Sequence, residues 1–180
     1  YDYLGRYEEA IEHYKQAIHI TQEIGNKKVE GENLGNLGSV YEALGKYEEA
    51  ATRLDALAKD SSAGPGVVAG MLAQAGQAWM MADNLEYAWR DQSRALELVP
   101  NNPQLWVDRA MALGLAGQYW EAIDDLNKAL DLQPGYAEAL IYRASAWRLL
   151  ESYELAMTDI ENVLGQDPQN VQALFERGKL

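Results

Sequence analysis

Few residues in this sequence have the types and spacing that catalysis requires. His13 and His19 lie six residues apart, on different faces of an expected helix, and no carboxylate or cysteine completes a zinc-binding set with them. No nucleophile is paired with a base, and the chain contains no cysteine. The stretch GENLGNLG lacks the G-x-G-x-x-G spacing of a phosphate-binding loop. We therefore expect no catalytic, metal or cofactor site and no enzyme.

Two charged residue types recur at a fixed interval in the second half of the chain. The spacing is 34 residues for both sets: Arg109, Arg143 and Arg177, and Asp91, Asp125 and Asp159. An Arg and an Asp that recur together predict a bidentate ion pair bracing adjacent helices. An ionic ligand site is the functional alternative.

The charge balance limits the expected partners. The formal net charge is −13 and the isoelectric point about 4.5, so nucleic acid and anionic membranes would be repelled. No apolar run of about 18 residues predicts a membrane span. With 48% hydrophobic residues and no signal-peptide pattern, we expect a folded cytoplasmic protein.

The recurring charges belong to a longer internal repeat. Residues 105–134 align with 140–168 at a shift of 34, and 1–17 align with 41–58 at a shift of 40. Each unit contains two apolar stripes at helical spacing, and proline ends several units. Short breaks are expected between the two helices of each unit: Gly5, Gly45, Asp83-Asn84, Gly117 and Glu151-Ser152.

Each unit also has residues of fixed size at fixed places. A large residue such as Trp106 occurs early in the first helix, and a small residue follows four positions later: Gly38, Gly76, Ala110 or Ala144. This pattern resembles the tetratricopeptide repeat (TPR) over essentially the whole chain. The resemblance implies an all-α, right-handed α-solenoid (superhelix) of antiparallel helix pairs that serves as a non-catalytic interaction scaffold. Glycine inside a helix costs about 1 kcal/mol against alanine, so close packing is expected at Gly35, Gly38 and Gly76.

The repeats are of two types. Residues 1–58 use the longer spacing and contain Leu-Gly-Asn-Leu-Gly, similar to the TPRs of the Leu-Gly-Asn-repeat family and kinesin light chains; their first unit lacks most of its first helix. Residues 71–180 are similar to ordinary 34-residue TPRs and end in a lone first helix. A Ser/Gly/Pro cluster at 59–70 is expected to form a loop or kink. Such a change indicates recombination or an engineered chimera of two TPR proteins.

The resemblance implies a concave groove, lined by the first helices, that binds a peptide or helix. TPRs that hold acidic chaperone tails use Lys, Arg and Asn in this groove; only Asn36 and Lys179 match, so such a tail is not the expected partner. Met and Leu residues indicate a partly apolar groove, unless they pack against neighbouring helices instead. The groove residues are Asn36, Ser39, Gln74, Gln77, Met81, Asp108, Met111, Leu115, Tyr142, Ser145 and Leu149.

An aromatic residue replaces an expected surface carboxylate. Trp120 stands where other units have glutamate, and Tyr87 and Leu155 replace Glu or Asp at a neighbouring slot. An outer contact surface formed by these three side chains is one interpretation, and isolated exposed apolar residues, which are common on protein surfaces, are the alternative.

The two ends of the chain are complementary in sequence. Tyr1 aligns with Trp147 and Leu180 with Ala146, so the end followed by the start would read as an uninterrupted TPR. The alternative function is therefore a natural or engineered building block that stacks head to tail. The residues of this joint, all expected to be exposed, are Tyr7, Ala10, Ile11, Tyr14, Leu174, Phe175 and Gly178.

Overall fold

The computed structural model describes residues 2–43, 46–60 and 64–180. Over these residues it contains ten α-helices and no strand: α1 (Asp2–Glu23), α2 (Lys27–Ala43), α3 (Tyr47–Asp60), α4 (Pro65–Met81), α5 (Leu85–Leu98), α6 (Pro103–Leu115), α7 (Tyr119–Leu132), α8 (Ala137–Leu149), α9 (Tyr153–Gln166) and α10 (Val171–Arg177). The helices form two compact units, Tyr1–Val99 (unit 1) and Pro100–Leu180 (unit 2).

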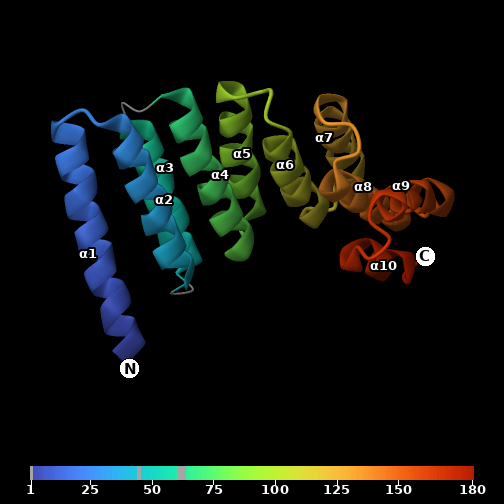
Figure 1. Cartoon of the computed structure of the whole chain (residues 1–180), viewed down its shortest axis with the longest axis horizontal. Helices are drawn as coiled ribbons and strands as arrows, with labels where there is room; N and C mark the ends of the chain where they lie inside the picture. The colour runs from blue at the N-terminus through green and yellow to red at the C-terminus, as the bar shows by residue number, and fades with distance from the viewer. Residues whose placement is uncertain (1, 44–45, 61–63) are drawn as a thin grey trace. The chain divides into compact units, whose positions relative to one another are not determined.

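In unit 1, helices α1 to α5 lie side by side in chain order (Figure 1). Each packs against the next, and α2 also contacts α4. We call α2 and α4 the inner helices of this unit. Its core contains the fully buried side chains of Leu54 and Leu72, with Leu37, Ala75 and Trp79 also buried.

Unit 2 repeats this arrangement with helices α6 to α10. Here α8 contacts both α6 and α10, so these three are the inner helices, while α7 and α9 are the outer ones. One core cluster includes Val107, Ala110 and Leu126, and a second includes Ala144 and Ile160. Alternating inner and outer helices explain the two apolar stripes of each sequence unit, since every helix buries one face against its neighbours.

Three of the predicted breaks between paired helices are confirmed. Asp83 and Glu151 have φ of 59° and Gly117 has φ of 76°, the left-handed conformation that ends a helix sharply. The break expected at Gly5 is wrong: α1 continues through it, because one glycine costs a helix only about 1 kcal/mol. The break expected at Gly45 lies outside the described residues.

The loop or kink expected at 59–70 is wrong over most of its length. Helix α3 continues to Asp60 and α4 begins at Pro65, with Gly64 as its N-cap; residues 61–63 lie outside the described residues. Proline is well suited to the first turn of a helix, so this cluster starts a helix. Since α3 packs against α4, both repeat types meet within unit 1.

Two of the helical glycines mark close helix packing, as predicted. A Cβ at Gly38 would lie 3.0 Å from Gln74 Oε1 and 3.3 Å from Leu54 Cδ1. A Cβ at Gly76 would lie 2.6 Å from Nε2 of Gln92, a fully buried side chain. At Gly35 the nearest atom, Gln74 Nε2, would be at an ordinary 3.6 Å, so packing there does not require glycine.

The predicted Arg–Asp braces are present in unit 2. Arg109 Nε and Nη2 donate to Asp125 Oδ2 and Oδ1 at 2.7 and 2.6 Å, joining α6 to α7. Arg143 makes the same pair of bonds to Asp159 at 2.8 and 2.7 Å, joining α8 to α9. Both pairs are bidentate and hold an inner helix to its outer partner, which supports the structural interpretation.

Asp91 lacks this partner because alanine occupies the corresponding Arg position in α4. The fully buried carboxylate instead accepts hydrogen bonds from Trp79 Nε1 at 3.2 Å and Arg90 Nε at 2.9 Å. Arg90 and Arg94 also pair with Asp55 of α3. Burial raises the pKa of Asp91, while the hydrogen bond from Arg90 opposes that rise.

The packing at Gly76 gives a stability prediction. We expect Gly76→Ala to lower the free energy of unfolding by about 1–3 kcal/mol, because its Cβ overlaps three atoms of the buried Gln92. Gly70→Ala, in the same helix but with no atom near its Cβ, should instead raise it by about 1 kcal/mol. Urea unfolding followed by circular dichroism measures both changes; equal effects would contradict the packing argument.

Candidate functional site

A cavity opens among α6, α7 and α8 of unit 2, with a volume of about 220 Å³. Five of the predicted groove residues line it: Met111, Leu115, Tyr142, Ser145 and Leu149. Leu115 and Leu149 are exposed at its mouth, whereas Met111 and Tyr142 pack partly against the core. None of its lining residues is charged within this fully described unit, so the cavity is suited to an apolar group.

Helical spacing brings these residues to one place. Met111 and Leu115 are four apart on α6, and Tyr142, Ser145 and Leu149 follow three and four apart on α8, so each set shares one helix face. The contact between α6 and α8 then sets the two faces side by side.

The cavity also has a floor that we did not predict, formed by Ala110, Gly114, Tyr119, Ala122, Leu126 and Ala146. Gly114 is informative, since a Cβ there would meet no atom within 4 Å. The corresponding residues of the neighbouring repeats are Met80 and Arg148. A glycine at a position where the neighbouring repeats have large side chains therefore indicated, in the sequence, a cavity in the groove.

Next to the cavity the same helix faces become polar and acidic. Asp108 of α6 is buried, and its Oδ1 accepts a hydrogen bond from Gln104 Nε2 at 3.0 Å. The Tyr136 hydroxyl lies within hydrogen-bond distance of Gln104 Oε1 and, at 3.0 Å, of Glu138 Oε2 of α8, and its single proton can be donated to either oxygen. Tyr142 lies between this network and the apolar cavity, one helical turn after Glu138.

The pKa values of Tyr136 and Tyr142 are both raised. Burial raises the pKa of Tyr136 to about 12, with the hydrogen bond and the charge of Glu138 adding to the rise. Burial also raises the pKa of Tyr142, and the carboxylates of Glu138 and Asp108 add to that rise. Burial disfavours the charged phenolate because it is removed from water, and the nearby carboxylates disfavour it further.

The predicted groove residues of unit 1 do not form a comparable set. Asn36, Ser39, Gln77 and Met81 are exposed, and Ser39 Oγ donates to the carbonyl of Gly35 at 3.2 Å. Between α2 and α4 there is a hollow of about 550 Å³ whose lining includes four glycines; of the predicted residues only Gln74 lines it.

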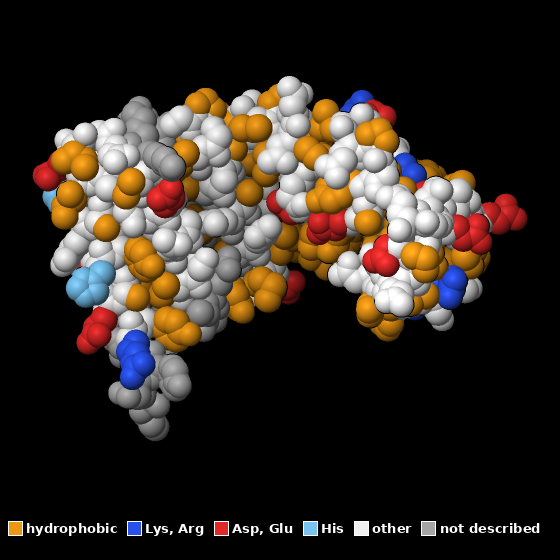
Figure 2. Space-filling view, in the orientation of Figure 1, with side chains coloured by type: hydrophobic (Ala, Val, Ile, Leu, Met, Phe, Trp, Pro, Cys, Tyr) orange, Lys and Arg blue, Asp and Glu red, His pale blue; other side chains and the backbone are white. Residues whose placement is uncertain are grey.

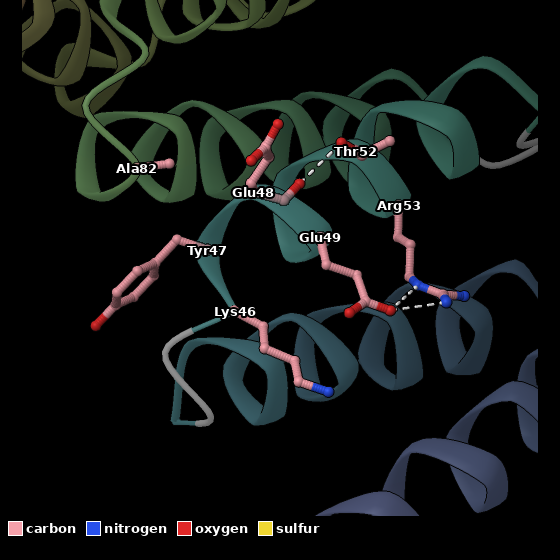
Figure 3. A pocket seen from close by; sticks show the side chains of 7 residues that line it. All are labelled: Lys46, Tyr47, Glu48, Glu49, Thr52, Arg53 and Ala82. Carbon is pink, nitrogen blue, oxygen red and sulfur yellow. Dashed lines mark hydrogen bonds and ion pairs between the residues drawn. The ribbon is translucent and has the colours of Figure 1, made fainter.

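A further hollow of about 820 Å³ lies beside α3. The residues that line it, shown in Figure 3, are Lys46, Tyr47, Glu48, Glu49, Thr52, Arg53 and Ala82. Arg53 points to Glu49, and its Nη2 lies 2.9 Å from Glu49 Oε1. Thr52 Oγ1 donates to the carbonyl of Glu48 at 2.8 Å. Arg53, Glu49 and Thr52 are thus hydrogen-bonded within α3 itself.

The predicted outer contact residues are exposed but belong to different units. Trp120 is 60% exposed, and its ring meets that of Trp147 edge-on with centroids 5.6 Å apart. Leu155 is exposed on α9 of the same unit. Tyr87 is in unit 1, where its ring packs against Trp79 with centroids 4.9 Å apart and under Arg90.

The residues of the predicted end-to-end joint are only partly exposed. Leu174 and Phe175 of α10 and Gly178, which follows the helix as its C-cap, are exposed, Phe175 by 65%. The expected exposure of the α1 face is wrong: Ile11 is buried, and Tyr7, Ala10 and Tyr14 are half-buried. The reason is that α1 packs along α2.

Neither a metal site nor a membrane span is found in the described ranges. No group of three His, Cys, Asp or Glu side chains there could hold a metal ion. Among the helices of these ranges, none is long and apolar enough to cross a bilayer.

Inner and outer helices in alternation define a helical repeat protein, and the comparisons specify which kind. Two tetratricopeptide-repeat family models match, over residues 1–56 and 93–124. The second TPR domain of human RPAP3, determined in complex with the HSP70 peptide SGPTIEEVD, is 30% identical; the match covers 64% of this chain and 97% of that domain, with a TM-score of 0.61. The chain therefore belongs to the TPR proteins.

Two more distant structures share the fold. YrrB, described as a TPR protein with an unusual peptide-binding site, is 19% identical, and the match covers 99% of this chain and 87% of YrrB with a TM-score of 0.73. The Arabidopsis OM64 TPR domain is 22% identical, with coverage of 64% and 96% and a TM-score of 0.62. The comparison with curated proteins found no match.

The raised pKa of Tyr136 gives a prediction for alkaline pH. Its folded-state pKa lies above the unfolded value of 10, so its contribution to stability is complete below pH 10 and is lost as pH rises towards about 12. We expect the free energy of unfolding of Tyr136→Phe to fall less than that of the wild type between pH 10 and about 12. Urea unfolding across the window measures the difference, with Tyr153→Phe, at an exposed tyrosine, as control. Identical pH profiles for wild type and Tyr136→Phe would contradict the assignment.

Proposed function

We propose that this protein is a non-catalytic interaction scaffold that binds a peptide or helix on the inner helices of unit 2. The observation that carries the proposal is the uncharged cavity of about 220 Å³ among α6, α7 and α8. Its exposed rim of Leu115 and Leu149 offers apolar surface to a ligand, and Tyr142 and Ser145 offer hydroxyls that fix orientation.

The size and lining of the cavity indicate a bulky apolar side chain as the part of the ligand that enters it. Methionine adapts its shape to different partners, and Met111 lies on the α6 side. An apolar anchor buried in such a pocket supplies much of the binding energy in protein interfaces. The RPAP3 domain, similar to this chain, is known with a bound peptide, which supports peptide binding as the general activity.

We further propose that an acidic chaperone tail is not the ligand. Of the groove positions, only Asn36 and Lys179 carry residues suited to clamp a carboxylate, and they belong to different units. The inner face of unit 2 has carboxylates at Asp108 and Glu138 instead, which would repel an acidic tail.

Filling the cavity tests this proposal. Gly114→Met, which copies Met80 of the preceding repeat, places a side chain in empty space and favours the helix, so the protein should fold at least as stably. We expect peptides selected from a random displayed library on the wild type to lose binding to this variant.

The matched control is Gly165→Met, the same change near the end of α9 with no atom close to its Cβ. Selected peptides should still bind it. If they also bind Gly114→Met with undiminished affinity, or if no peptide is enriched, the cavity is not a binding site.

A second candidate function is head-to-tail self-association through α10. Leu174 and Phe175 leave exposed apolar surface there, although α1 offers less in return because Ile11 is buried. We expect the mass measured by light scattering to rise with concentration between about 1 and 500 µM if this contact forms.

Phe175→Asp should then keep the protein monomeric. The control Leu132→Asp, which adds the same charge at an exposed leucine of α7, should still self-associate. A constant monomer mass for the wild type over this range would exclude self-association as a function.

A further inference from the structure

The acidic edge of the cavity indicates what lies next to the apolar anchor in the ligand, an inference that rests on the proposed function. Glu138 begins α8 one turn before Tyr142, and Asp108 lies on α6 one turn before Met111. In the 34-residue register Asp108 corresponds to Tyr142 and Glu138 to Gln104, so the two carboxylates are offset by about one helical turn. Each precedes the cavity-lining residues of its own helix, and the two helices are in contact. The edge is held in place, since Gln104 bonds Asp108 and the Tyr136 hydroxyl lies within hydrogen-bond distance of both Gln104 and Glu138.

The charges of unit 2 leave this edge negative. Residues 100–180 contain twelve Asp and Glu against six Lys and Arg. Five of the six basic side chains pair with carboxylates at distances up to 3.9 Å: Arg109, Lys128, Arg143, Arg148 and Lys179. Figure 2 shows carboxylates beside apolar side chains on the visible face of this unit. Tyr142, which lines the cavity, has a pKa raised mainly by burial, and the charges of Glu138 and Asp108 add to that rise.

We propose that the cavity binds a basic apolar segment of a protein, in which a bulky apolar side chain fills the cavity and a Lys or Arg lies beside the partly exposed Glu138, with the buried Asp108 adding to the negative field. From Glu138 to Tyr142 the helix rises about 6 Å, and to Ser145 about 10 Å. An extended peptide covers about 7 Å in two residues, and a helix about 6 Å in four. The basic residue is therefore two to four positions from the anchor.

A selection experiment with random peptides tests the proposal directly. A random peptide library is displayed and selected on the wild-type chain, and on the Glu138→Lys variant in parallel. We expect the wild type to enrich sequences with a bulky apolar residue and a Lys or Arg two to four positions away. Glu138→Lys should shift that enrichment from basic towards acidic residues.

Calorimetry on the synthesised consensus peptide then measures the contribution of the charge. We expect Glu138→Gln to weaken binding about tenfold, as for loss of one hydrogen bond to a charged group. Glu154→Gln, at an exposed position of α9, should leave the affinity unchanged. The acidic peptide SGPTIEEVD, which the RPAP3 domain binds, should show no binding.

The outcomes separate the two levels of the proposal. In one outcome, the selected peptides that depend on Gly114 carry no basic residue; in another, they bind Glu138→Gln as tightly as the wild type. Either result overturns the proposal of a basic ligand but leaves the cavity as the binding site. Binding of SGPTIEEVD likewise overturns it. If no selected peptide depends on Gly114, the proposed function fails as well.

Discussion

The fold depends on how closely neighbouring helices approach one another. A single helix pair cannot bury both of its apolar stripes, so each pair needs the next one. Small residues make that approach possible, as at Gly38 against Leu54 and Gly76 against Gln92. In unit 2, the Arg109–Asp125 bridge fixes the distance from an inner helix to its outer partner.

The same amino acid has the opposite effect where no neighbour fills the space it leaves. Gly76 is packed tightly against a buried side chain, while Gly114 is surrounded by free volume. A repeat protein can therefore open a cavity in its inner face without altering its framework.

Much of the architecture was readable from spacing alone. The intervals of 34 residues located the helix pairs and the turns at Asp83, Gly117 and Glu151, because left-handed turn residues and apolar stripes are local signals. The Arg143–Asp159 bridge was predictable because both residues recur together. The start of α4 at Pro65 was missed because a cluster of Ser, Gly and Pro favours both a loop and a helix start.

Burial and cavities were harder to predict, since they depend on side chains from several helices at once. Ile11 was expected at the surface, but the packing of α1 along α2 covers it. The alignment placed Met111 and Tyr142 in one groove, yet the hole between them depends on Gly114 and on Ala122 and Leu126 from the outer helix. The acidic edge formed by Asp108 and Glu138 became visible only with the Gln104 and Tyr136 contacts.

The apolar lining of the cavity also has a consequence for the water inside it. A cavity of about 220 Å³ is large enough to hold several water molecules. Three side chains of the lining carry hydroxyls to which such water could hydrogen-bond, Tyr119, Tyr142 and Ser145, because the remaining lining is alanine, glycine, leucine and methionine. Water held this loosely is readily displaced by an apolar group. Ligand entry should therefore carry the negative heat-capacity change of apolar burial, whichever of enthalpy and entropy dominates at room temperature.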